Sequence, residues 1–252
     1  MITHKIPCFL MAGLGFFVRL VKEKKMVHTK TSHHDRMEVF LEKYREPLPK
    51  PLEELERKAL SEDVPIIRSG TRDMLRFLLR ERKPKEVLEI GTAVGFSALC
   101  MREYLPKSSH ITTIEKVEMR LKEARGNLEM LDEDDRITLL EGDAAEVLKQ
   151  LLTKGKSYDF IFMDAAKGQY LNFLPDVIAL MADDAMLVSD NIFHDGDVLE
   201  SRYAVLRRDR TIHGRMREYL QVLCEKEELE TICLPIADGM TISTKKRNGK
   251  GE

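Results

Sequence analysis

Short apolar runs alternate with longer amphipathic segments from Pro84 onward, and this alternation predicts the fold. We expect strands at residues 87–90, 111–115, 137–141, 160–163 and 186–189. Helices are expected between them, around residues 97–104, 117–131, 144–152 and 170–181. Strands that alternate with helices form right-handed βαβ units. The pattern therefore predicts an α/β protein with a mostly parallel, doubly wound sheet.

The two ends of this region follow other patterns. Residues 229–234 and 240–244 read as two strands joined by five residues that include Gly239, which predicts an antiparallel hairpin at the edge of the sheet. Apolar positions at helical spacing predict helices over residues 52–59 and 70–82. We expect an N-terminal helical cap at 31–83, a sheet domain at 84–245 and a disordered charged tail at 246–252.

The first residues are treated separately. Their apolar run, residues 9–18, is too short to span a membrane, and the strongest positive cluster follows the run instead of preceding it. A secretory signal is a poor match, and Met26 is an equally plain start for the chain. We expect residues 1–30 to be a flexible extension and the protein to be cytoplasmic, without membrane contact.

Polar side chains follow two of the predicted strands. Asp164 and Lys167 come after one apolar run, and Asp190 and Asn191 come after the next. Ligands of α/β proteins bind at the carboxyl edge of the sheet, where these side chains should meet. Three oxygen donors there suit a hard divalent cation. The simpler alternative is that each carboxylate only ends a strand or caps the following helix.

A glycine-containing turn after the first sheet strand points to a nucleoside ligand. Gly91 and Gly95 leave room for a ligand beside the backbone, but the pattern is not the three-glycine motif of dinucleotide sites. Glu89, just before the turn, would repel a phosphate and attract a cation. Glu115 lies about 20 residues further on, at the spacing used to bind ribose hydroxyls, although it could instead only favour a helix N-terminus. A nucleoside with a positive group, such as S-adenosylmethionine, fits these features.

Taken together, the motifs resemble the cation-dependent class I O-methyltransferases, which include the catechol and caffeoyl-CoA enzymes. The resemblance covers residues 66–245 and is carried by 88–91, 95–97, Glu115, 142–144, Asp164 with Lys167, and Asp190 with Asn191. It implies a Rossmann-like, seven-stranded sheet with an antiparallel C-terminal hairpin. It also implies S-adenosylmethionine and Mg²⁺ or Mn²⁺ as cofactors, and commonly a homodimer.

The resemblance also implies roles for single residues. Lys167, beside Asp164, takes the position of the catalytic base, and the metal ligands are Asp164, Asp190 and Asn191. The positions that match the cofactor contacts of the family are Ile67, Glu89, Gly91, Ser97, Glu115, Asp143, Ala144 and Asp164.

A narrower similarity concerns the acceptor. Residues 165–170, 195–197, 201–203 and 207–213 are similar to bacterial tRNA 5-hydroxyuridine methyltransferases, which make 5-methoxyuridine at the wobble position of the anticodon loop. An arginine cluster downstream of the metal motif could hold the RNA backbone, although a solvated helix face is the default for such a run. The cluster consists of Arg202, Arg207, Arg208, Arg210, Arg215 and Arg217.

Composition does not decide between acceptors. The net charge of −2 gives no global attraction to nucleic acid, and the lack of tryptophan speaks against an aromatic-lined mouth. The leading expectation is methylation of tRNA, and the main alternative is a small hydroxylated aromatic of the catechol type. A non-catalytic S-adenosylmethionine-binding protein is a third class of answer. The four cysteines lack metal-ligand spacing, which indicates reduced thiols and no zinc site.

Overall fold

The computed structural model describes residues 33–194 and 196–247. The extension predicted at residues 1–30 lies outside the described residues, as do Asp195 and residues 248–252 of the predicted tail. The chain divides into two compact units, residues 1–44 and 45–252. In the first unit the described part contains helix α2 (His33–Glu42), which is followed by a turn that brings the rings of Phe40 and Tyr44 within 5.5 Å.

The second unit is built around a seven-stranded sheet, which confirms the predicted fold class. Its strand order is β3-β2-β1-β4-β5-β7-β6. Strands β1 to β5 are parallel, and β7 runs antiparallel to both β5 and β6. The strands are β1 (Glu86–Ile90), β2 (His110–Glu115), β3 (Ile137–Glu141), β4 (Tyr158–Met163), β5 (Met181–Asp190), β6 (Leu229–Leu234) and β7 (Met240–Lys245).

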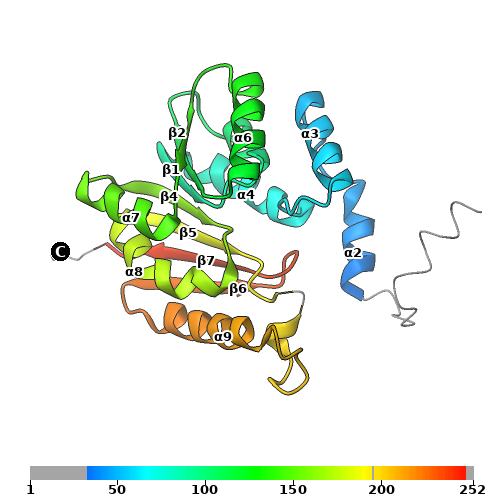
Figure 1. Cartoon of the computed structure of the whole chain (residues 1–252), viewed down its shortest axis with the longest axis vertical. Helices are drawn as coiled ribbons and strands as arrows, with labels where there is room; N and C mark the ends of the chain where they lie inside the picture. The colour runs from blue at the N-terminus through cyan, green and yellow to red at the C-terminus, as the bar shows by residue number, and fades with distance from the viewer. Residues whose placement is uncertain (1–32, 195, 248–252) are drawn as a thin grey trace, which may run out of the picture. The chain divides into compact units, whose positions relative to one another are not determined.

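Helices cover both faces of the sheet (Figure 1). Successive strand residues point to opposite faces, so Val87 and Phe160 pack in one apolar core while Leu88 and Ile161 pack in the other. The first core includes residues of α3, α4 and α5, and the second includes residues of α7, α8 and α9. The helices are α3 (Lys50–Ser61), α4 (Ser69–Arg82), α5 (Phe96–Tyr104), α6 (Glu118–Leu131), α7 (Ala144–Thr153), α8 (Tyr170–Leu180) and α9 (Arg210–Glu225), with short 3₁₀ turns η1 (Lys167–Gln169) and η2 (Asp197–Leu199).

Two elements extend the sequence-based picture. Strand β5 begins five residues earlier than expected, directly at the end of α8. Helix α9 occupies the segment that was described only as an arginine cluster, and its buried residues His213, Met216, Tyr219 and Leu223 recur every three or four positions. Within the described residues, none of the helices has the length and apolar composition needed to span a bilayer.

The strand order reverses at β1, which lies between β2 and β4. The chain therefore leaves the carboxyl ends of β1 and β4 in opposite directions, and the space between the two connections is where open α/β sheets bind ligands. The structure places the loops after β1, β2, β4 and β5 around this point.

Candidate active site

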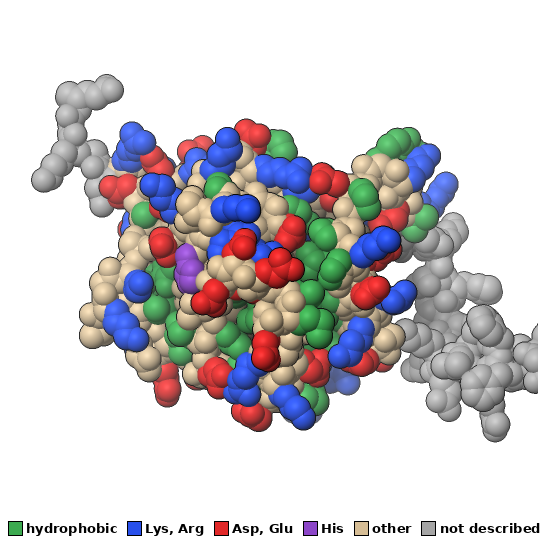
Figure 2. All heavy atoms as spheres, turned by 90° about the horizontal axis from the view of Figure 1, so that it is seen from above, with side chains coloured by type: hydrophobic (Ala, Val, Ile, Leu, Met, Phe, Trp, Pro, Cys, Tyr) green, Lys and Arg blue, Asp and Glu red, His purple; other side chains and the backbone are tan. Residues whose placement is uncertain are grey.

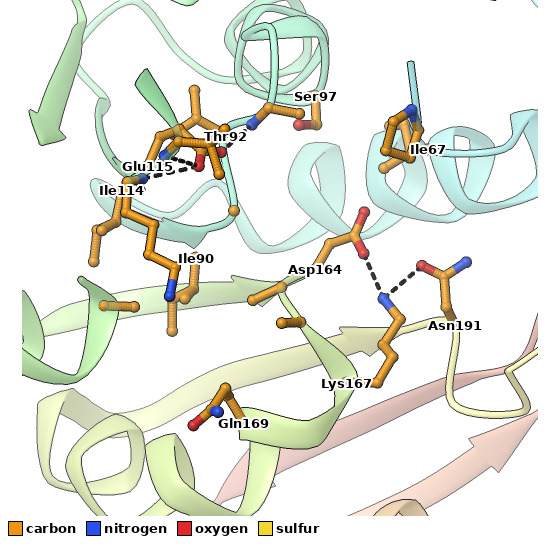
Figure 3. A pocket seen from close by; sticks show the side chains of 18 of the residues that line it. Ile67, Ile90, Thr92, Ser97, Ile114, Glu115, Asp164, Lys167, Gln169 and Asn191 are labelled. Carbon is orange, nitrogen blue, oxygen red and sulfur yellow. Dashed lines mark hydrogen bonds and ion pairs between the residues drawn. The ribbon is translucent and has the colours of Figure 1, made fainter. Parts of the chain in front are cut away.

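A cavity of about 600 Å³ opens at this edge of the sheet (Figure 3). It brings together most of the residues predicted from the sequence, although they come from six separate parts of the chain. The predicted residues that line it are Ile67, Gly91, Ser97, Glu115, Asp143, Ala144, Asp164, Lys167 and Asn191. Glu89 and Asp190 are fully buried and do not line the cavity.

The glycine turn follows β1 and presses against the end of β4. Gly91 has φ +109°, and a Cβ atom there would collide with the carbonyl oxygen of Asp164. The backbone N–H groups of Gly91 and Thr92 both donate to the Ile114 carbonyl at 3.1 Å, which fixes the turn to the end of β2. Gly95, with φ +85°, then opens α5. Glycine at position 91 is therefore required by the fold itself.

Glu89 is a buried carboxylate with an unsatisfied oxygen. Its Oε2 accepts a hydrogen bond from Thr113 Oγ1 at 2.5 Å, and the Ser97 hydroxyl also donates to the carboxylate. Oε1 has no hydrogen-bond partner among the described residues. Burial raises the pKa of Glu89 to about 7, against the lowering effect of the two hydroxyl donors. An orphaned buried acceptor linked to the cavity through Ser97 fits the ammonium group of S-adenosylmethionine.

Glu115, at the end of β2, is held rigidly at the cavity wall. Its Oε2 accepts from the backbone N–H of Ala93 at 2.9 Å, and its Oε1 accepts from Lys116 and Val117 at 2.8 and 2.9 Å. Three backbone donors thus orient the carboxylate. Its remaining lone pairs suit hydroxyl groups such as those of a ribose.

Asp143 both caps a helix and faces the cavity. Its Oδ1 accepts from the Ala145 N–H at 3.0 Å, as expected for the N-cap of α7, and its Oδ2 pairs with Lys116 Nζ at 3.0 Å. The Lys116 ammonium and the capping N–H hold the pKa of Asp143 below its ordinary value. Ala144 continues the wall from the same helix start. A role of Asp143 as a helix cap and its predicted place at a ligand are both compatible with this arrangement.

At the other end of the cavity, Lys167 joins the ends of two strands. Its Nζ donates to Asp164 Oδ1 at 2.8 Å and to Asn191 Oδ1 at 2.9 Å (Figure 3), and lies 3.3 Å from the Tyr170 hydroxyl. Asp164 follows β4 and Asn191 follows β5, so these three predicted residues form one polar cluster. Asn191 has φ +53°, a conformation that asparagine tolerates better than most residues.

Asp190 lies behind this cluster with one oxygen unsatisfied. Its Oδ1 accepts from Thr71 Oγ1 at 3.0 Å and from the Asn191 N–H at 2.8 Å, whereas Oδ2 has no partner among the described residues. Burial, and then the charge of Asp164, raise the pKa of Asp190 to about 7. Two carboxylates and an amide oxygen form an all-oxygen donor set that fits Mg²⁺ or Mn²⁺. Among the described residues, no group of three or more His, Cys, Asp or Glu side chains is placed to hold a metal ion, so the candidate donor set includes the amide of Asn191.

Two supporting residues escaped the sequence analysis. Thr71 comes from α4, 119 positions before the carboxylate it contacts. The buried Tyr170 hydroxyl lies 3.0 Å from the Met163 carbonyl and 3.1 Å from the Asp190 carbonyl, so it links the two strand ends that carry the polar cluster. The Thr71 contact joins distant segments, and Thr71 belongs to no local motif. Tyr170 lies in the motif 165–170, but the sequence assigned it no role of its own.

The arginine cluster divides into two groups. Arg210, Arg215 and Arg217 donate to the backbone carbonyls of Val205, Gly168 and Val198, so they fasten the loops around α9. The second group is exposed and consists of Arg202, Arg207 and Arg208. Half of the predicted phosphate-binding residues therefore also have a structural role.

Comparison with known proteins identifies the family. A family model described as O-methyltransferase matches residues 43–246. Caffeoyl-CoA O-methyltransferase 1 of Eucalyptus globulus is 29% identical over 199 residues, covering 77% of this chain and 81% of that protein. A catechol O-methyltransferase of Niastella koreensis is 30% identical over 127 residues, covering 50% of this chain and 58% of its own.

A solved structure gives the same result. The methyltransferase PaMTH1 of Podospora anserina, determined with S-adenosylhomocysteine bound, superposes with a TM-score of 0.75 at 25% identity. The match covers 84% of this chain and 95% of that one. The family match spans the whole sheet and the cavity residues described above. The chain therefore belongs to the O-methyltransferase family and is an S-adenosylmethionine-dependent O-methyltransferase.

Proposed function

We propose that the enzyme methylates one oxygen of a small aromatic compound with two neighbouring hydroxyl groups, with the help of a divalent cation. The observation that carries the proposal is the Lys167 cluster, in which one amine lies within 3 Å of both Asp164 and Asn191. The cluster shares a cavity with the residues that fit S-adenosylmethionine. The relatives named as catechol and caffeoyl-CoA O-methyltransferases support the same class of acceptor.

In this proposal the cofactor lies along the cavity from α7 to the Lys167 cluster. Asp143 and Ala144 would contact the adenine, Glu115 the ribose hydroxyls, and Ser97 with Glu89 the ammonium group. Gly91 leaves the backbone accessible beside the methionine part, and Ile67 covers it with an apolar side chain. Asp164 touches both the glycine turn and Lys167, so it would lie near the methionine part of the bound cofactor.

Asp164, Asp190 and Asn191 would hold the cation, because they supply oxygen donors at two adjacent strand ends. Asp190 Oδ2 is also buried and has no hydrogen-bond partner in the described part of the chain. When bound, a divalent cation acidifies a hydroxyl group and orients it. A pair of neighbouring hydroxyls, as in a catechol, suits such a site because both oxygens can approach the same point. A single phenolic hydroxyl would be positioned less well.

Lys167 would act as the base. The amine accepts the proton of one acceptor hydroxyl, and the resulting oxygen anion attacks the methyl carbon of the sulfonium. The new O–C bond forms as the C–S bond breaks, and the sulfur keeps the electron pair to give S-adenosylhomocysteine. Tyr170 and Asn191 fix the amine between the two strand ends, which keeps it close to the reacting oxygen.

The proposal is tested by methyl transfer from labelled S-adenosylmethionine to a panel of acceptors. We expect label in catechol and in caffeoyl-CoA, and far less in phenol, which lacks the second hydroxyl. Equal labelling of phenol and catechol would overturn the role assigned to the hydroxyl pair. Label in neither would overturn the small-molecule reading.

A second candidate acceptor is tRNA carrying 5-hydroxyuridine at the wobble position. The observation that favours it is a surface loop in which Arg202, Arg207 and Arg208 are exposed and Tyr203 is 88% exposed. Arginine forks bind phosphates and an exposed aromatic ring can stack on a base. Against it, the net charge of −2 gives no overall attraction to nucleic acid. Positive and negative side chains are also interspersed on the face of α6 seen in Figure 2, which lies on the opposite side of the molecule from this loop.

The same panel separates the two candidates. Undermodified tRNA that takes up label as 5-methoxyuridine, with no label in catechol, would favour the RNA reading. Replacing Arg202, Arg207 and Arg208 by alanine together should then lower transfer to tRNA and leave S-adenosylhomocysteine binding unchanged. The homodimer implied by the family resemblance stays a prediction, which light scattering of the purified protein would test.

A further inference from the structure

Two cysteine sulfurs lie close together on the surface, away from the active site. Cys224, in the last turn of α9, and Cys233, on the edge strand β6, have Sγ atoms 4.0 Å apart. Both side chains are exposed. Because the two cysteines belong to different elements, it is the tertiary fold that brings their sulfurs together.

Neighbouring contacts hold the two elements in this register. Thr231 Oγ1 lies 3.4 Å from the carbonyl of Leu223, the residue that precedes Cys224. It also lies 2.9 Å from Ser243 Oγ on the adjacent strand β7. Thr231 and Cys233 are two positions apart on β6, so they project from the same face of the strand, toward the end of α9. The sulfurs are therefore neighbours in the folded protein, as a cross-link requires.

We propose that Cys224 and Cys233 form a redox modification site, at which a peroxide oxidises the two thiols to an intramolecular disulfide. In the first step one thiolate attacks a peroxide oxygen, the O–O bond breaks, and a sulfenic acid and one water are formed from hydrogen peroxide. In the second step the other sulfur attacks the sulfenic sulfur and displaces hydroxide, which leaves as a second water. Two thiols lose their hydrogens and one peroxide is reduced to two waters.

The surroundings favour this pair over the remaining described cysteine. Cys100 lies within α5, is fully buried in the core and is far from reagents in solvent, and burial raises the pKa of its thiol well above the ordinary value. Partial burial and the adjacent sulfur raise the pKa of Cys233 to about 11.

The cross-link requires only a small movement. A disulfide bond is about 2 Å long, so the sulfurs must approach by about 2 Å. Rotation of two exposed side chains supplies part of such a movement without disturbing a packed core. The disulfide would join α9 covalently to β6.

Helix α9 also contacts the turn that carries Lys167. Arg215 of α9 donates a hydrogen bond to the Gly168 carbonyl in η1.

Peptide mapping of the full-length protein tests the proposal. Cys8 lies outside the described residues and is replaced first, so all samples carry Cys8→Ser. The protein is treated with hydrogen peroxide, remaining thiols are alkylated in denaturant, and the sample is digested with trypsin without reduction. Cleavage after Lys226 separates the two cysteines into peptides 218–226 and 227–245. We expect a species with the summed mass of both peptides less two hydrogens, while Cys100 is recovered alkylated.

Matched variants make the result decisive. Oxidation should raise the melting temperature of the Cys8→Ser protein, because a disulfide restricts the unfolded chain. Cys224→Ser and Cys233→Ser should each abolish both this rise and the linked species. The proposal is overturned if the two peptides stay unlinked with their cysteines alkylated or oxidised singly. It is equally overturned if the only linked species joins two copies of the same peptide, because the cross-link is then between molecules.

Discussion

Replacing Glu89 by glutamine should stabilise the cofactor-free protein above neutral pH while weakening cofactor binding. The side chain keeps its shape but loses its charge. In the structure the Glu89 carboxylate is fully buried, its Oε1 has no partner among the described residues, and its pKa is raised to about 7. Ionisation of Glu89 therefore lowers the free energy of unfolding, and a bound cationic ligand would offset this loss.

The sign and the size follow from the pKa difference. Because the pKa is higher in the folded state than its ordinary value of 4.5, the folded state binds the proton more tightly, and stability falls as pH rises from 4.5 through 7. Below pH 4.5 the cost is absent. Well above pH 7 it reaches about 3 kcal/mol. The amide of glutamine brings its own unsatisfied group, so we expect a gain of about 1 to 3 kcal/mol, or roughly 3 to 10 °C in melting temperature for a unit of this size.

The assay is thermal unfolding of wild-type and Glu89→Gln protein at pH 5 and pH 8, followed by titration with S-adenosylhomocysteine. The variant should melt higher at pH 8, the difference should shrink strongly at pH 5, and its affinity for the ligand should fall about 10- to 100-fold through loss of a charged hydrogen bond. Glu86→Gln, an exposed position at the other end of the same strand, is the control and should change neither quantity. A stability difference that is equal at both pH values, or a variant that binds the ligand as tightly as wild type, would refute the reasoning.

Three further changes test other parts of the site. Gly91→Ala should lower the free energy of unfolding in urea by about 3 kcal/mol or more, because the new Cβ collides with the carbonyl of Asp164 and φ is +109°. The control Gly126→Ala, on the open surface of α6, should instead raise it by about 0.5 to 1 kcal/mol. Equal effects at both positions would contradict this expectation. Lys167→Met should lower the rate of methyl transfer by about 10²- to 10⁴-fold while calorimetry finds S-adenosylhomocysteine affinity within a few-fold of wild type, and an unchanged rate would remove its role as base. Thr71→Val removes the hydroxyl that donates to Asp190, so half-maximal activation should need about 10-fold more Mg²⁺, whereas an unchanged Mg²⁺ dependence would show that this hydrogen bond does not orient the carboxylate.

Periodicity was sufficient for the architecture because each strand carries its own signal. Strand 137–141 was predicted with the bounds that the structure has, and the hairpin followed from a short connection containing Gly239. Strand β5 was predicted too short because its first residues, including Asp183 and Asp184, do not alternate as a buried strand should. Helix α9 was not predicted, because its buried positions are separated by charged and polar residues that obscure their helical spacing.

The polar positions were predictable where a motif ends a strand. Asp164, Lys167 and Asn191 meet in the structure because parallel strands end at one edge of the sheet. The sequence could not show that Glu89 and Asp190 would be buried behind the cavity instead of lining it. Nor could it show contacts between distant segments, since a hydrogen bond over 119 positions leaves no trace in local spacing.

The sequence predicted the methyl acceptor less well than the fold. The six arginines look alike in the sequence, but in the structure Arg215 and Arg217 donate to backbone carbonyls, whereas Arg202 and Arg207 are exposed. Side chains of one type serve different purposes according to what lies within reach, and only coordinates reveal this. The comparisons support the catechol-type acceptor that was expected as the alternative.

The most direct test of the account is the rate of methyl transfer to catechol in EDTA, followed by addition of Mg²⁺ to the same sample. We expect EDTA to abolish transfer, excess Mg²⁺ to restore it, and S-adenosylhomocysteine to bind equally well in both conditions. Transfer that continues unchanged in EDTA would contradict the assignment of Asp164, Asp190 and Asn191 as a cation site and leave Lys167 to act without it.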